Sequence, residues 1–224
     1  MSGHNYPMLV SPPAAAVCDT GLPPKTGQTT SYAARDDGDD EFGAGVSILE
    51  LSQNNPFGHK RRFTGITGGY HNGTTWVDKN GNNTTEALAF PFNLVCDFGQ
   101  YSSYQDQFPM IYRVDSGATS VNWDNGRLWA NALNINGWTD FRLINARIMS
   151  NLIYHYNPAS GAYALNYPPF NNATFAHYWT GTNSSAEAKY LVQSDCSIVG
   201  VAKTTTTFKR ALAMRMGKLS DLTV

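Results

Sequence analysis

The sequence has little charge and no long apolar run. Only 15% of its 224 residues are Asp, Glu, Lys or Arg, whereas soluble domains carry about 25%. The 16 basic and 17 acidic side chains give a net charge of -1, so the basic excess of a nucleic-acid binder is missing. No stretch approaches the roughly 18 consecutive apolar residues of a membrane helix. We therefore expect no nucleic-acid partner and no membrane insertion.

Cysteine is also scarce. Cys18, Cys96 and Cys196 are an odd number at wide spacings, which fits neither a disulfide scaffold nor a zinc site. We expect reduced thiols, with a single disulfide as the alternative. Residues 1–13 contain no Lys or Arg and no apolar run of about 7 to 15 residues, so we expect no secretory signal there.

Asn, Thr and Gly, with 20 residues each, dominate the polar part of the composition. The 42% of hydrophobic residues suffice for one substantial core. Residues 1–45 hold five of the 11 prolines and the acidic run Asp36–Glu41, with almost no hydrophobic periodicity. This composition predicts an extended Pro-rich arm over 1–45, suited to packing against a neighbouring subunit, followed by one domain over 46–224.

Two segments of the domain have helical periodicity. In Asp124–Ile135 the apolar side chains Leu128, Trp129, Ala132 and Leu133 share one helical face. In Asn145–Tyr156 a second apolar face recurs, and Asn145 is suited to cap the helix. Its members are Ile148, Met149, Leu152, Ile153 and Tyr156.

Short alternating runs bounded by Gly, Asn, Ser and Thr predict strands on both sides of these helices. They are Arg62–Ile66, Thr74–Asp78, Tyr178–Thr180, Lys189–Val192, Ser197–Ala202 and Phe208–Met216. The pattern indicates a β-rich α+β domain with its helices in the middle of the chain.

No common enzyme motif is present: the sequence contains no nucleophile elbow, P-loop, dinucleotide-binding glycine pattern or zinc-protease helix. The five histidines, His4, His59, His71, His155 and His177, have no metal-ligand spacing and are expected to be surface or structural residues. Clustered oxygen ligands in Asp36–Glu41 and Asp78–Asn83 leave calcium open, but a solvated linker and an Asn-Gly turn explain them better. We expect no metal and no cofactor.

Two further groups of residues invite a functional interpretation. The basic run His59–Arg62 is too small for a nucleic-acid footprint and is expected to be a solubilising strand entry. Rigid amphipathic rings among Asn, Ser and Gly form good recognition surfaces, although loop packing explains them as well. On this basis the predicted binding residues are Tyr101, Tyr104, Tyr112, Tyr163 and Tyr167, all assigned to loops.

Several short segments follow the order found in a known domain family. They are Lys25–Ala34 with Asp36–Asp39, Arg62–Thr64, Trp129–Leu133, Gly137–Leu143, Asn145–Tyr156, Pro169–Asn172, Tyr178–Thr182 and Arg215–Gly217. On these segments the chain resembles the Lcl C-terminal-like domain family of collagen-like adhesins and of many bacterial and phage proteins of unassigned function. The resemblance spans roughly Thr26 to Gly217.

The resemblance implies a C-type-lectin-like domain with twisted antiparallel sheets, two short helices and long loops, similar also to formylglycine-generating enzymes. It does not imply one activity. The calcium signature of the lectins is absent, and Trp123-Asp124-Asn125 only scrambles their Trp-Asn-Asp. Cys196 has no neighbouring cysteine in its region, so the cysteine pair of the formylglycine enzymes is not matched either.

These observations favour a non-enzymatic binding or structural protein of a phage virion, such as a fibre, tail-tip or capsid decoration protein. Its expected partners are other virion proteins or further copies of itself, with a trimer as one symmetric state, and a host cell-surface glycan or protein. A bacterial surface adhesin that binds glycan or matrix is the alternative. The third hypothesis is an enzyme using Cys196 or the carboxylates Asp106, Asp115 and Asp124, whose spacing indicates no catalytic pair.

Overall fold

The fold combines mostly short β-strands with few helices. The computed structural model describes residues 51, 54–100, 106–116, 121–153, 156–157, 162–163, 169–170, 177–184, 186–192, 198–203 and 209–223. The predicted arm, Cys18 and Cys196 lie outside these residues. The predicted mixed α+β class is confirmed for the described chain.

A five-stranded sheet has the order β1-β4-β5-β13-β6, and every neighbouring pair in it is antiparallel. Its strands are β1 (Phe63–Thr64), β4 (Leu94–Asp97), β5 (Gln107–Tyr112), β13 (Ala213–Lys218) and β6 (Arg142–Leu143). The last strand, β13, thus lies between two strands from the middle of the chain. The predicted strand Phe208–Met216 is interrupted at Leu212, so that its first part joins a different sheet.

That second sheet has four strands in the order β11-β10-β9-β12. They are β9 (Tyr178–Asn183), β10 (Glu187–Leu191), β11 (Ile198–Ala202) and β12 (Arg210–Ala211). Only β12 runs parallel to its neighbour, β9. The two sheets approach each other where Gly181 N donates to Ile144 O at 2.8 Å, just after β6.

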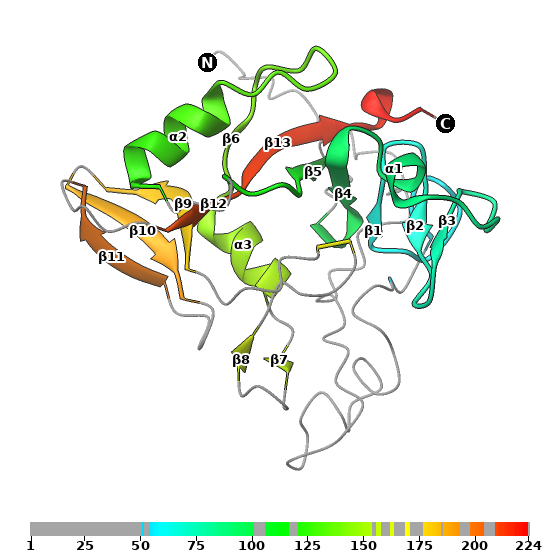
Figure 1. The fold of residues 1–224 in the computed structure, drawn as a ribbon, viewed down its shortest axis with the longest axis horizontal. Coiled ribbons are helices and arrows are strands. Elements are labelled where there is room, and N and C mark those ends of the chain that lie inside the picture. Colours follow the sequence, from blue (N-terminus) through cyan, green and yellow to red (C-terminus); the bar gives the residue numbers. More distant parts are fainter. Residues whose placement is uncertain are drawn as a thin grey trace, which may run out of the picture.

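Two small hairpins and the short helical segments complete the described fold (Figure 1). The hairpins pair β2 (Tyr70–His71) with β3 (Trp76–Val77), and β7 (Tyr156–Asn157) with β8 (Ala162–Tyr163). The helices are α1 (Glu86–Ala89), α2 (Trp123–Asn131) and α3 (Ala146–Ile153), with 3-10 turns η1 (Pro91–Asn93), η2 (Phe98–Gln100) and η3 (Leu219–Asp221). None of the described helices has the length and apolarity needed to cross a bilayer.

The sheets lie between two hydrophobic clusters because their strands alternate in period two. Val95 of β4 and Met214 of β13 point into one cluster with Ile148, Met149 and Leu152 of α3, which we call the α3-side core. Their chain neighbours point the other way, into a cluster with α2 that we call the α2-side core. It includes Leu94, Cys96, Ala213, Trp123, Ala130 and Trp179.

Both predicted helices are present, as α2 and α3, and both end earlier than predicted. Asn145 Oδ1 accepts the Ile148 N–H at 2.8 Å and caps α3, which ends at Ile153, so that Tyr156 belongs to β7. In α2 the buried residues are Trp123, Gly126 and Ala130. Half of the predicted face is correct: Trp129 and Leu133 are half-buried against the α2-side core, whereas Leu128 is 55% exposed and Ala132 is also exposed.

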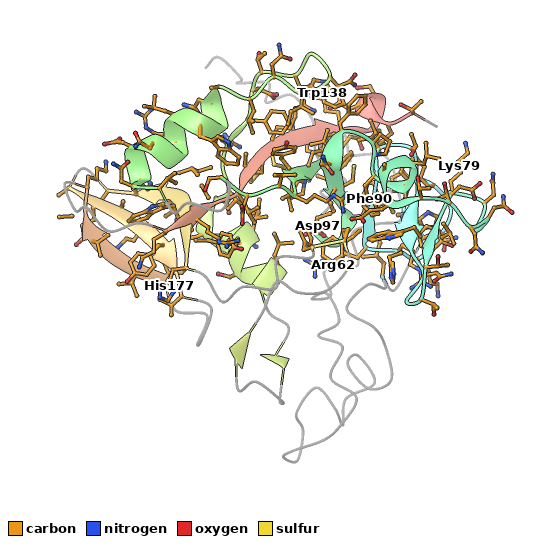
Figure 2. The ribbon with its side chains drawn as sticks, in the orientation of Figure 1. Arg62, Lys79, Phe90, Asp97, Trp138 and His177 are labelled. Carbon is orange, nitrogen blue, oxygen red and sulfur yellow. The ribbon has the colours of Figure 1, made fainter. Side chains whose placement is uncertain are left out.

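Arg62 corrects the interpretation of the basic run His59–Arg62. Its guanidinium is 1% exposed and forms a bidentate ion pair with Asp97, which is 0% exposed, through Nε to Oδ1 at 2.7 Å and Nη2 to Oδ2 at 3.0 Å. Figure 2 places the pair beside β1 and β4. Because a buried charge needs such a partner, Arg62 is a core residue and not a solubilising strand entry.

Candidate functional site

Aromatic and cationic side chains gather where the start of α2 meets the outer strands of the four-stranded sheet. We call this the α2–β10 surface, and its members are Trp123, His177, Tyr190, Lys203 and Lys209. They come from α2, from the turns flanking β9, β11 and β12, and from β10. Figure 2 labels His177 at its edge.

Tyr190 is the centre of the surface. Its ring packs edge-on against the buried Trp179 ring, with centroids 5.6 Å apart. The exposed His177 ring lies 5.6 Å from the Tyr190 ring, and Lys209 Nζ lies 4.6 Å from the Tyr190 centroid. A half-buried tyrosine is thereby held between a fixed indole and two side chains that reach solvent.

Trp123 is the second aromatic platform. Asn122 Oδ1 accepts the Asn125 N–H at 2.8 Å and caps α2 directly before it. The indole N–H donates to Thr180 O at 3.0 Å, which fixes the ring against β9. Lys203 Nζ lies 5.0 Å from the Trp123 centroid, and the Arg127 guanidinium lies 5.8 Å from it.

Val121 connects the two platforms. Its N–H and C=O exchange hydrogen bonds with Lys209 at 2.8 and 2.9 Å, and its carbonyl also accepts the Trp179 indole N–H at 2.7 Å. Lys209 is therefore bonded to the residue that leads into Asn122 and Trp123. The surface is built on backbone pairs and buried rings, and this rigidity suits a recognition site.

The charge on this surface is unevenly compensated. Arg127, Lys189 and Arg210 each pair with a carboxylate, Asp124, Glu187 and Asp115 respectively. Lys203 Nζ instead donates to the Asn183 amide oxygen at 3.3 Å. In the part of the chain that the structure describes, neither Lys203 nor Lys209 has a carboxylate within 4.0 Å. Burial lowers the pKa of Lys209, because its ammonium has lost part of its hydration.

This arrangement can bind groups that complement it. An ammonium over an aromatic ring is attracted by the ring's negative face, and a partly desolvated lysine with no carboxylate partner is stabilised when an anionic group approaches. The half-buried Tyr190 ring and the exposed His177 ring add contact area with little loss of side-chain entropy. The arrangement has the chemistry to contact anionic or aromatic groups.

The structure describes only two of the five tyrosines predicted to bind. Tyr112 lies at the end of β5, half-buried, with its ring 6.5 Å from Trp129, so its assignment to a loop is wrong. Tyr163 lies in β8, also a strand. Tyr101, Tyr104 and Tyr167 lie outside the described residues. The binding role of all five stays a prediction.

Sequence reasoning missed the residues of the α2–β10 surface because they share no motif. Trp123, His177, Tyr190, Lys203 and Lys209 are spread over 87 positions and meet only through sheet pairing. The available signal was weak: an aromatic residue in the β10 run and lysines at the ends of neighbouring strands.

The other candidate residues have structural partners. Asp115 pairs with Arg210 at 2.6 Å and Asp124 with Arg127 at 3.7 Å, whereas Asp106 is an exposed turn residue at φ 49°. His59 is a structural histidine: its Nδ1 accepts from Asn55 Nδ2 and its Nε2 donates to Gly68 O, both at 3.1 Å. Burial lowers its pKa.

The loop Asp78–Asn83 uses its carboxylate internally. Asp78 Oδ1 accepts the N–H groups of Asn80 and Asn82, both at 2.9 Å, and Gly81 supplies a positive φ of 86°. Over the described ranges, no group of three or more His, Cys, Asp or Glu side chains could hold a metal ion.

No protein-family model matches the chain, and a search of curated proteins finds no similar sequence.

Proposed function

We propose that this chain is a non-enzymatic binding and structural protein, a component of a phage virion whose C-type-lectin-like domain recognises another protein or a host surface. The observation that carries the proposal is the α2–β10 surface. It holds two lysines that have no carboxylate partner among the described residues and lie against aromatic rings, and its cations and rings suit contact with a partner.

The arrangement of elements is compatible with the proposed fold. Two helices, α2 and α3, pack on opposite faces of largely antiparallel sheets, and the C-terminal strand β13 lies inside the larger sheet (Figure 1). These features support the family resemblance seen in the segments Trp129–Leu133 and Tyr178–Thr182. A bacterial adhesin would use the same surface, and it differs from a virion component in where the chain is found.

The test is density-gradient fractionation of the producing culture, with mass spectrometry of each band. We expect the chain to migrate with particles at a fixed ratio to the main structural protein. Migration with cells or with free protein would overturn the virion assignment, and enrichment on cells would favour the adhesin.

The contribution of the α2–β10 surface is tested by Tyr190→Ala, which removes the ring under Lys209 and His177. We expect the apparent affinity for particles or partner to fall about tenfold, as for an aromatic residue central to an interface. Tyr70→Ala is the matched control, because Tyr70 also packs against a histidine, His59 at 4.5 Å, and an arginine, Arg61 at 5.3 Å. If only Tyr70→Ala lost binding, the binding site would lie at the β2–β3 hairpin and not at the α2–β10 surface.

A further inference from the structure

The charge of this chain is divided unevenly between its two parts. Residues 1–45 contain six acidic and two basic side chains, which leaves 11 acidic and 14 basic side chains for residues 46–224. The arm therefore carries a net charge of -4 and the domain +3, although the whole chain has -1. Such a separation favours attraction between the arm and the domain.

On each side, part of this charge is concentrated at one place. Five of the six acidic residues of the arm fall within the run Asp36–Glu41. On the domain, Lys203 and Lys209 have no carboxylate partner in the described part of the chain and lie on the two linked platforms of Trp123 and Tyr190.

We infer that the acidic run Asp36–Glu41 of one copy binds the α2–β10 surface of a second copy, so that the arm joins neighbouring subunits. The inference rests on the proposed function, because it names the partner of the surface proposed there. The proposed ligand of the surface is a peptide segment rich in carboxylates, and the proposed contact lies between two copies of the chain.

The reach of the arm favours a second copy over its own domain. The arm enters the domain at Leu51, whose N–H donates to Lys60 O at 2.7 Å, close in sequence to β1 and the β2–β3 hairpin. Figure 1 shows this hairpin and the strands β10 and β11 at opposite ends of the long axis. The chain from Glu41 to Leu51 has ten Cα–Cα steps and spans at most about 35 Å when fully extended. A domain of this size is about 40 Å across, so binding to its own surface would require a fully stretched arm around it.

Electrostatic pairing sets the expected behaviour in salt. The proposed contact is exposed at its rim, so salt screens the attraction between its charges. The Debye length, over which this attraction acts, falls from about 30 Å at 0.01 M salt to about 3 Å at 1 M. Each carboxylate–lysine pair of this kind changes affinity up to roughly fivefold, so that several pairs together hold or release a subunit. High salt should therefore separate the copies.

The test is light scattering of the full-length chain after gel filtration, at about 0.01 M and about 1 M salt. We expect a multiple of the 24.6 kDa chain mass at low salt and 24.6 kDa at high salt. The double variant Lys203→Glu/Lys209→Glu should be monomeric at both. The matched control Lys60→Glu/Lys79→Glu makes the same charge change at exposed lysines near the other end of the molecule and should remain oligomeric.

A charge swap separates a lost contact from a misfolded variant. Adding Asp36→Lys, Asp37→Lys and Asp39→Lys to the Lys203→Glu/Lys209→Glu chain should restore the oligomer. A wild-type monomer at low salt, an oligomer that survives Lys203→Glu/Lys209→Glu, or a swap that restores nothing would each overturn the inference. If the chain is monomeric but its association with particles depends on Tyr190, the inference fails and the proposed function stands. If the chain forms a salt-sensitive oligomer that is absent from particles, the inference stands and the proposed function fails.

Discussion

At the scale of single residues, the most deeply buried ion pair of the described core joins Arg62 to Asp97. Both groups are buried, and Asp97 Oδ1 also accepts the Gly99 N–H at 3.0 Å. Removing one member of such a pair leaves a charge without water or partner. The pair joins β1 to β4 across a sequence separation of 35 residues.

We predict that Asp97→Asn lowers the free energy of unfolding by about 3–5 kcal/mol, because it leaves the Arg62 guanidinium buried and uncompensated. Chemical denaturation measures this. Asp124→Asn is the control, since it makes the same change in an exposed ion pair and should cost less than about 1 kcal/mol. Equal losses in the two variants would contradict the structural role of the pair.

At the scale of elements, the Asp78 carboxylate shapes the loop after β3. Hydrogen bonds from the Asn82 side chain and then from backbone N–H groups lower the pKa of Asp78 below its ordinary value of 3.8. The folded loop therefore favours the charged form, and this stabilisation is complete above pH 3.8 and disappears as pH falls through the lowered pKa.

We expect the carboxyl signal of Asp78, followed by NMR, to titrate below 3.8, and the hairpin amides to lose protection as it protonates. Asp78→Asn should remove this part of the pH dependence. Asp124→Asn should retain it. A titration at or above 3.8 in the wild type would contradict the hydrogen bonds of the loop.

The two main helices show what local sequence determines. For α3, the periodicity and the Asn145 cap act together, and Ile148, Met149 and Leu152 of the predicted face are buried. For α2, the periodicity predicted that Leu128 is buried, whereas the fold buries Trp123, Gly126 and Ala130. Gly126 permits this choice, because a Cβ there would lie 3.3 Å from both the Ala211 and Val121 side chains. The buried face of α2 is therefore determined by close packing against β12, and no local sequence pattern predicts that packing.

At the scale of the whole molecule, the sheets are shared by both cores. Single strands such as β4 and β13 send alternate side chains into the α3-side and α2-side cores. The sequence predicted β1, β3, β9, β10, β11, β12 and β13 but not β4, β5 or β6. It predicted no strand partners: β13 pairs with β5 and β6 at large sequence separations. The α2–β10 surface depends on such pairings, and this is why its residues could not be assembled from the chain alone.

Because the cores share strands, we predict one unfolding transition. Met149→Ala, a fully buried change in the α3-side core, should cost about 2–5 kcal/mol. It should shift tryptophan fluorescence and far-UV circular dichroism together, although Trp123 and Trp179 lie in the α2-side core. Leu88→Ala, at a 67% exposed side chain, is the control and should shift neither. Separate shifts of the two probes would indicate independently folding halves.

The turn after α2 has a chemical consequence for the protein as it ages. Asn136 and Gly137 both have positive φ, 54° and 84°, in a two-residue hairpin turn closed by Trp138 N donating to Ile135 O at 3.0 Å. Asn136 is exposed, and in the described structure the Gly137 N–H has no acceptor.

At the other Asn-Gly pairs of the described chain, the glycine N–H is held by a neighbour. Gly73 N donates to His71 Nδ1, Gly81 N to Asp78 O and Gly126 N to Asn122 O. The Gly137 nitrogen is the one left available to attack the preceding side-chain amide, expel ammonia and form a succinimide that water opens to aspartate or isoaspartate. Deamidation during storage should therefore begin at Asn136, adding one negative charge two residues from Trp138.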